Sequence, residues 1–256
     1  FLLPTTACLI QDQLGIPCTA GALDFNLGCT GFIYGLSLAK GLIETSQATN
    51  ILLLTGETYS KFIRPEDRSV RTLFGDGAAA TLVQGKETSK NSPNEGIGPF
   101  IFGTDGSGAH NLKAEYSGVR SIKFSKSDLP SEEPSKEKYL YMNGPKIFNF
   151  TLKVVPQCVQ ELLSKSRLTL KDIDLFVFHQ ANAHILEHLR DKLNIDQSKF
   201  HLALEHVGNT VSSTIPIALK DALSSQKLKP GQRIMLVGFG GGYSWASTLV
   251  NWFHNK

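Results

Sequence analysis

The sequence has little of the features that mark several specialised classes of protein. Its net charge is only +3, from 26 Lys and Arg against 23 Asp and Glu, an excess too small to indicate a nucleic-acid-binding protein. No apolar run approaches the length of a membrane span, because Gly, Lys, Thr or Asp interrupts every candidate. The 256 residues and 41% hydrophobic content instead predict a globular protein with a sizeable core.

Cysteine is scarce, and its spacing excludes two further classes. Cys8, Cys18, Cys29 and Cys158 match neither a set of metal ligands nor a disulfide framework, so we predict no metal site. No signal peptide is visible, and a reducing, cytoplasmic setting is expected. The sequence begins at Phe1, within what reads as the tail of an element, so we expect residues upstream to be missing.

The stretch 23–45 holds the first candidate for chemistry. Apolar residues alternate over 23–27 as in a half-buried strand, and they recur at helical spacing over 32–43. Cys29 lies between the two patterns, flanked by glycines, where the start of a helix favours a thiolate. This arrangement is typical of a nucleophile, whereas a buried cysteine that packs as a small hydrophobe is the alternative. The other three cysteines stand in patterns that predict burial.

Two passages of the chain resemble each other. A polar residue, a helical pattern and an apolar strand pattern occur in this order at 29–56 and again at 209–238, and each passage leads to a glycine turn and a strand ending in Thr-Leu-Val. The polar insertion 57–73, predicted to be a loop or lid, is present only in the first. This order predicts a duplicated unit that places Cys29 and Asn209 at equivalent helix starts. Chance similarity of two generic α/β units is the alternative.

Three further features carry possible chemistry. His179 closes the apolar strand pattern 174–178 at its carboxyl end, where open α/β sheets place their sites, although a core histidine is the alternative. Asn209 opens a helix, so it is either a simple N-cap or a functional amide. The three glycines at 240–242 suit a backbone N–H directed at negative charge, but glycine-rich turns are common.

Taken together, five motifs match one family. NLGCTGFIYGL, FGDGAAATLV, FHQANAHIL, HVGNTVSSTIPIAL and GFGGGYSWAS resemble, in order and spacing, the motifs of β-ketoacyl-acyl carrier protein synthase III, a thiolase-superfamily enzyme. The resemblance implies an α/β, thiolase-like five-layered αβαβα fold of two duplicated halves, with the N-terminal part of the first half absent from this chain. The implied divisions are a first half with the cysteine at 1–84, a connecting and excursion segment at 85–138, and a second half at 139–256.

The resemblance also implies roles for the polar residues. Cys29 would attack an acyl-CoA thioester and carry the acyl group. His179 and Asn209 would stabilise the enolate that forms when malonyl-acyl carrier protein loses carbon dioxide. An oxyanion hole would consist of the backbone N–H groups of Cys29 and Gly241. No cofactor is implied, since the CoA thioester and the carrier protein are substrates, and a homodimer is expected.

Substrate contacts follow from the same resemblance. The residues that it assigns to the acyl, pantetheine and CoA groups are Arg68, Phe74, Met142, Gly144, Phe148, Ala181 and Asn182, with Leu3 reaching across the dimer to the partner's acyl pocket. One departure concerns the carrier protein. His184 stands where the family often has an arginine, and Asn149 and Asp191 stand where lysines are expected. Docking of the carrier is therefore predicted to be atypical.

The sequence therefore predicts a decarboxylative Claisen condensation of an acyl-CoA with malonyl-acyl carrier protein through acyl-Cys29, in fatty-acid or related lipid or polyketide synthesis. One alternative is a specialised relative that uses a different acceptor or condenses two acyl thioesters. An alternative outside enzymes is an acyl-CoA-binding partner subunit. The presence of Cys29, His179 and Asn209 argues against the last.

Overall fold

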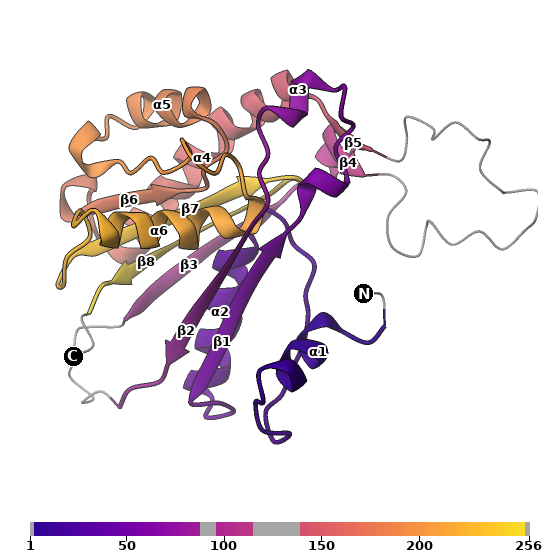
Figure 1. Cartoon of the computed structure of the whole chain (residues 1–256). Helices are drawn as coiled ribbons and strands as arrows, with labels where there is room; N and C mark the ends of the chain where they lie inside the picture. The colour runs from indigo at the N-terminus through magenta and orange to yellow at the C-terminus, as the bar shows by residue number, and fades with distance from the viewer. Residues whose placement is uncertain (1–2, 88–95, 115–138, 254–256) are drawn as a thin grey trace, which may run out of the picture.

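The computed structural model describes residues 3–87, 96–114 and 139–253 (Figure 1). Residues 88–95 and 115–138 of the predicted connecting and excursion segment lie outside them. The helices are α1 (Thr6–Gln13), α2 (Gly31–Glu44), α3 (Arg68–Arg71), α4 (Gly144–Ser166), α5 (Ala183–Lys192) and α6 (Thr214–Ser224), with short 3-10 turns that include Tyr59–Lys61, Gly106–Asn111 and Val211–Ser213. The strands are β1 (Asn50–Glu57), β2 (Gly77–Gln84), β3 (Ile97–Thr104), β4 (Leu112–Ala114), β5 (Leu140–Met142), β6 (Leu175–Phe178), β7 (Arg233–Gly240) and β8 (Ser244–Asn251).

A four-stranded sheet in the order β3-β8-β7-β6 forms the centre of the fold. β6 and β7 are parallel, and the other pairs are antiparallel. All four residues of β6 are buried, because helices cover both faces of the sheet. Phe176 and Phe178 pack in the core beneath α4 and α5, whereas Leu175 and Val177 pack on the opposite side. The apolar run at 174–178 is thus the strand that the sequence predicts.

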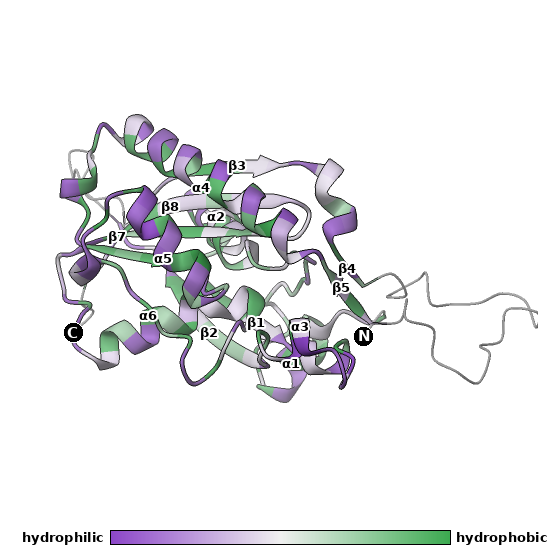
Figure 2. Ribbon diagram, turned by 90° about the horizontal axis from the view of Figure 1, so that it is seen from above, coloured by the Kyte–Doolittle hydropathy of each residue, from purple (hydrophilic) through white to green (hydrophobic). Residues whose placement is uncertain are grey.

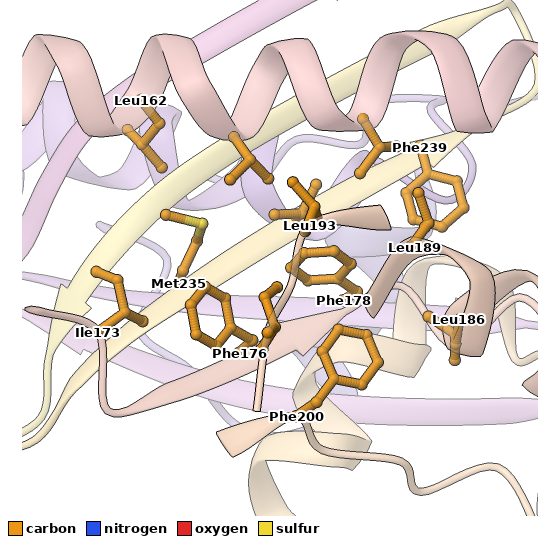
Figure 3. Close-up of a cluster of buried hydrophobic side chains, with 14 of the residues drawn as sticks. Leu162, Ile173, Phe176, Phe178, Leu186, Leu189, Leu193, Phe200, Met235 and Phe239 are labelled. Atoms are coloured by element: carbon orange, nitrogen blue, oxygen red, sulfur yellow. The ribbon is translucent and has the colours of Figure 1, made fainter. Parts of the chain in front are cut away.

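The outer helices α4 and α5 cover one face of this sheet. The helical spacing of α4 places Val155, Val159 and Leu162 fully inside, in one cluster with residues of the sheet. Figure 3 shows Leu162 on the side of α4 that faces Met235 and Phe176. Each such side chain contributes about 1.5–3 kcal/mol when it is fully buried. In Figure 2 both helices carry hydrophilic and hydrophobic segments, as amphipathic helices that cover a sheet do.

The inner helices α2 and α6 lie between the two sheets. Phe32, Ile33 and Leu36 of α2 share a core with Ile215 and Ala218 of α6, and this core also includes residues of both sheets. On the far side, β1 and β2 form an antiparallel pair. The described residues therefore build four successive layers, which are the outer helices, the four-stranded sheet, the inner helices and the β1–β2 sheet (Figure 1).

One expectation about the first half is wrong. The predicted half-buried strand at 23–27 does not form, and Leu23 and Phe25 are 62% and 41% exposed. β1 forms as predicted, and its outer face is open, since Leu52 of β1 and Leu82 of β2 are 41% and 58% exposed. An apolar pattern reports that a surface suits burial, whereas burial itself needs a covering element.

The segment that the sequence treats as a connection contributes β3 to the central sheet, where it pairs with β8. α1 stands apart at the edge of the layers, with none of its residues buried, and the carboxylate of Asp24 accepts hydrogen bonds from the N–H groups of Thr6 and Ala7 at its start. Within 3–87, 96–114 and 139–253, no helix combines the length and apolarity that crossing a bilayer requires.

Candidate active site

Cys29 lies just before α2, pressed against β7, and is 7% exposed. A Cβ atom added at Gly240 would lie 2.8 Å from both the Cβ and the Sγ of Cys29, and one added at Gly238 would lie 3.0 Å from the carbonyl oxygen of Cys29. Such approaches are too close for a side chain, so β7 needs glycine at these positions. The Gly-Phe-Gly sequence of β7 is thus a consequence of where the cysteine lies.

The thiol of Cys29 is protonated at neutral pH. Burial, and next the charge of Glu57, raise the pKa of Cys29 to about 12. The backbone N–H groups of Cys29 and Gly241 hydrogen-bond the sulfur and lower its pKa, but burial outweighs them. The expectation that the helix start favours a thiolate is therefore wrong. A thiolate here would lose its hydration and gain only two N–H groups in exchange.

His179 directly follows β6, and its N–H donates to the carbonyl of Val237 at 2.7 Å. Its ring meets Phe239 edge-on, with the centroids 5.4 Å apart, and its Nδ1 lies 2.7 Å from Oγ1 of Thr214 on α6. Burial lowers the pKa of His179 to about 3, so the ring is neutral at pH 7. A neutral imidazole can donate a hydrogen bond without bringing a positive charge into the site.

Asn209 is held in place by the backbone of the first half. Its N–H donates to the carbonyl of Leu73 at 2.8 Å, and its own carbonyl accepts from the N–H of Gly75 at 3.0 Å. Its side-chain Oδ1 accepts from the N–H of Val211 at 2.9 Å. Because the amide oxygen is used in this turn, the amide NH₂ is left as the donor. The N-cap interpretation of Asn209 is wrong, because Thr210 is the N-cap of the 3-10 turn Val211–Ser213 and Ser213 is the N-cap of α6, so the oxygen of Asn209 instead closes the turn before them.

One cavity of about 510 Å³ joins the three side chains. Its volume is in the range of small-molecule sites, roughly 300–1,000 Å³. The predicted residues that line it are Cys29, His179, Asn209, Phe74, Met142, Gly144, Phe148, Ala181 and Asn182. His184 lies on the same lining, from the first turn of α5. Within the described ranges, no cluster of three or more His, Cys, Asp or Glu side chains could hold a metal ion.

Three predicted residues relate to the cavity differently. Gly241 approaches the site through its backbone N–H, beside the sulfur of Cys29. Arg68 is the first residue of α3 and is not part of the cavity lining. Its neighbour Ser69 is the residue of α3 that lines the cavity. Leu3 is 86% exposed. The cross-dimer role predicted for Leu3 requires a second copy of the chain and stays a prediction.

Several residues of the site are ones that the sequence motifs did not indicate. Leu112 and Phe239 line the cavity. Phe239 stands directly before the glycine run, which is a signal that could have identified it, whereas Leu112 comes from the connecting segment and has no such signal. Glu57 at the end of β1 is a further omission. Burial raises the pKa of Glu57, and its Oε1 accepts from Oγ of Ser212 at 2.6 Å.

The remaining cysteines divide differently from the prediction. Cys158 is buried as expected, and its thiol donates to Oγ of Ser247 at 3.1 Å. Cys8 and Cys18 are exposed, so the expectation of burial is wrong for both. The reason for Cys8 is that α1 buries none of its residues. Cys29 is the one of the four that meets the cavity.

A buried cysteine at the start of an inner helix, with a histidine and an asparagine contributed by the other half, defines a thiolase-like condensing enzyme. The comparisons with known proteins agree. The family model described as 3-oxoacyl-[acyl-carrier-protein] synthase III matches residues 23–106, and its C-terminal counterpart matches residues 163–252. The chain belongs to the 3-oxoacyl-[acyl-carrier-protein] synthase III family, and the predicted family and fold class are confirmed.

Individual relatives are similar over nearly the whole chain. The β-ketoacyl-[acyl-carrier-protein] synthase III of Clostridium tetani is 38% identical over 254 residues, which is 98% of this chain and 74% of the relative. A solved 3-oxoacyl-(acyl-carrier-protein) synthase III is 49% identical, with a TM-score of 0.90 over 98% of this chain and 75% of the other. The synthase III of Thermus thermophilus is 34% identical, with a TM-score of 0.84 over 98% and 74%.

Proposed function

We propose that the protein condenses an acyl-CoA with malonyl-acyl carrier protein through an acyl-Cys29 intermediate, with loss of carbon dioxide, and so starts acyl chains. The names of its relatives suggest this reaction. One observation carries the proposal. Cys29, His179 and Asn209 line a single cavity, and the N–H of Gly241 lies against the sulfur of Cys29.

The first half-reaction is a thioester exchange at Cys29. The sulfur bonds to the acyl carbonyl carbon, the bond from that carbon to the sulfur of coenzyme A breaks, and the thiol proton ends on the departing coenzyme A. Forming the thiolate costs free energy, because burial raises the pKa of Cys29 to about 12. The N–H groups of Cys29 and Gly241 stabilise both the thiolate and the oxyanion that follows it.

The second half-reaction needs donors for an enolate. Loss of carbon dioxide from the malonyl group leaves negative charge on the thioester oxygen, and the carbanion equivalent then bonds to the acyl carbonyl carbon on Cys29. The bond from that carbon to the sulfur of Cys29 breaks, the β-ketoacyl product stays on the carrier protein, and the thiolate of Cys29 takes up a proton to restore the thiol. His179 and Asn209 are both neutral and buried, so each can donate a hydrogen bond in a site that excludes water. Donors fixed in advance at developing charge give the largest stabilisation in such a setting.

The carrier protein would approach the mouth of the cavity near α4 and α5. There the ring of His184 stacks on Phe148, with centroids 5.4 Å apart, and lies 4.2 Å from the ring of His188. Arg190 is paired with Asp191 at 2.6 Å. These contacts support the prediction of atypical docking for an acidic carrier. We also propose that the protein forms a homodimer in a cytoplasmic setting. Its two halves are proposed to be 1–84 and 139–256, with a connecting segment between them.

Two measurements test the function. Intact mass after incubation with acetyl-CoA should show one acetyl group on Cys29, and labelled malonyl-acyl carrier protein should then release labelled carbon dioxide. Acylation without release, even with malonyl-acyl carrier protein in excess, would favour the relative with a different acceptor. Binding of acyl-CoA with no acylation at all would favour the partner subunit and contradict the proposal.

A further inference from the structure

The hydrogen-bond partner behind His179 is a hydroxyl group. Oγ1 of Thr214 lies 2.7 Å from Nδ1 of His179 and 2.9 Å from the carbonyl oxygen of Val211. Thr214 is 2% exposed and Val211 is fully buried, so water does not compete for these groups. Nδ1 is thus turned away from the cavity that His179 lines, and Nε2 is the ring nitrogen left to meet a substrate.

A donor count limits what the ring can do. The hydroxyl of Thr214 has one proton, which goes either to Val211 or to Nδ1 of His179. The carbonyl of Val211 also accepts from the backbone N–H of Thr214, so it stays paired in either case. Among the described groups that meet Nδ1, only the Thr214 hydroxyl can donate, because the Val211 carbonyl is an acceptor alone. An unprotonated Nδ1 therefore has a hydrogen-bond donor only while Thr214 donates to it.

The backbone around this contact is strained in a way that fixes it. Val211 has a φ of 55°, a left-handed conformation that is rare for a β-branched residue. The N–H of Val211 is held by the side chain of Asn209, and the carbonyl of Val211 faces the hydroxyl of Thr214. Val211 thereby helps to orient both donors to the proposed enolate. Its N–H bonds the side-chain oxygen of Asn209, and its carbonyl contacts Thr214, the partner of His179.

We propose that Thr214 is a positioning residue, which donates to Nδ1 and so holds His179 as the tautomer with its proton on Nε2, directed into the cavity. This inference rests on the proposed function for its catalytic consequence, because only that tautomer can donate to the enolate oxygen. A carboxylate in place of the hydroxyl would favour a charged imidazolium instead. Burial keeps the ring neutral, and the hydroxyl sets which nitrogen carries the proton.

Removing the hydroxyl should invert the tautomer. Burial lowers the pKa of His179, and the Val211 carbonyl partly opposes this shift from behind the ring. In Thr214→Val that carbonyl is the acceptor that remains for Nδ1, so the proton moves to Nδ1 and Nε2 becomes a bare acceptor. The cost to decarboxylation should match the loss of one fixed donor to an oxyanion, roughly a hundredfold in rate. Acylation of Cys29 does not use this donor and should be largely retained.

The experiment compares the unmodified protein with Thr214→Val, Thr214→Ser and Thr210→Val. Thr210 is the matched control, because its hydroxyl is equally buried in the same segment but has no partner among the described residues. Nitrogen-15 NMR of histidine-labelled protein reports the tautomer, with the His179 signals assigned by their absence in His179→Gln. Carbon dioxide release from malonyl-acyl carrier protein and the acyl mass on Cys29 report the two half-reactions.

We expect protonated Nε2 in the unmodified protein, in Thr214→Ser and in Thr210→Val, and protonated Nδ1 in Thr214→Val alone. Decarboxylation should fall only in that variant. Protonated Nδ1 in the unmodified protein would overturn the inference, whatever the variants do. So would loss of activity in Thr210→Val equal to that in Thr214→Val, which would indicate packing. The NMR result does not depend on turnover, so it remains decisive if the proposed condensation itself is not observed.

Discussion

The two copies of the duplicated unit keep the same order of elements but differ in what joins their strands. In the first copy α2 leads to β1 and β2, and in the second α6 leads to β7 and β8, each pair being antiparallel. β1 and β2 are separated by the long insertion with α3, whereas β7 and β8 are joined by the tight turn 241–243. The insertion supplies a wall of the cavity, including Ser69 and Leu73, and the tight turn supplies the N–H of Gly241.

Contacts between the copies are reciprocal. The end of β7 presses on the helix start that carries Cys29, and the end of β1 bonds the helix start that follows Asn209, through Glu57 and Ser212. The hydroxyl groups of Thr30 and Ser244 lie 2.9 Å apart, and Oγ of Ser213 donates to the carbonyl of Gly77 at 3.1 Å. Each copy thus helps to position the polar residue at the helix start of the other.

The largest expected effect comes from removing Cys29, the polar residue at the helix start of the first copy. Cys29→Ala should abolish the acyl-enzyme, because no other residue supplies the sulfur that forms the thioester. Intact mass after exposure to acetyl-CoA measures this. Cys8→Ala is the matched control, since that thiol is exposed and outside the cavity lining, and it should acylate like the unmodified protein. Acylation that persists in Cys29→Ala would contradict the assignment.

The next-largest effect distinguishes the second half-reaction from the first. His179→Ala and Asn209→Ala should each reduce decarboxylation by about 3 kcal/mol, or roughly a hundredfold, because each removes a donor to the enolate. Acylation of Cys29 should largely survive in both. Rates of carbon dioxide release and of acyl transfer, measured on the same preparations, test this. Unchanged condensation by Asn209→Ala would show that Asn209 serves only to close the turn with Val211.

A smaller effect tests the contact of β7 with the nucleophile. In Gly240→Ala the new Cβ would meet Cβ and Sγ of Cys29 at 2.8 Å, so the free energy of unfolding should fall by about 1–3 kcal/mol and acylation should slow. Gly56→Ala in β1 is the control, since a Cβ there has open space. Denaturant unfolding and acylation rates give the comparison. Equal losses in the two variants would show that the contact has no special weight.

Glu57 provides a test of charge rather than of packing. Burial first and Glu57 second raise the pKa of Cys29, so Glu57→Gln should lower that pKa and speed alkylation. The gain should appear only above the pKa of Glu57, itself raised by burial, because below it the native carboxyl is already neutral. The pH profile of iodoacetamide incorporation at Cys29, resolved by peptide mass, measures it. Glu66→Gln, which changes an exposed carboxylate, should leave the profile unchanged.

The smallest effect concerns the mouth of the cavity. His184→Arg adds a permanent positive charge on α5 and should lower the apparent KM for an acidic carrier protein, most clearly at low salt. The acyl-CoA half-reaction should not change, because only docking is altered. Steady-state rates at several carrier and salt concentrations test this. An unaltered KM would mean that other groups dock the carrier, and the assignments of Cys29, His179 and Asn209 would be unaffected.

The exposure of the cysteines is a property that local sequence patterns did not predict. The sequence predicts Cys29 as the reactive thiol, against three buried ones, but the structure exposes Cys8 and Cys18 and buries Cys29. Exposed thiols should therefore alkylate before Cys29. A helical or strand pattern describes a face of an element. Whether α1 or the outer face of β1 is covered depends on what packs over it, which the pattern does not contain.

The sequence by itself predicted the repeated order of helix and strand in the two halves and the placing of Cys29 and His179 at element ends, because periodicity and turn chemistry act over a few residues. Only the tertiary structure decided the protonation of Cys29, the dual use of the Asn209 amide and the partner behind His179. These depend on burial and on contacts between residues far apart, such as Glu57 with Ser212, 155 positions away. Desolvation and such distant hydrogen bonds exist only once the two halves have packed together.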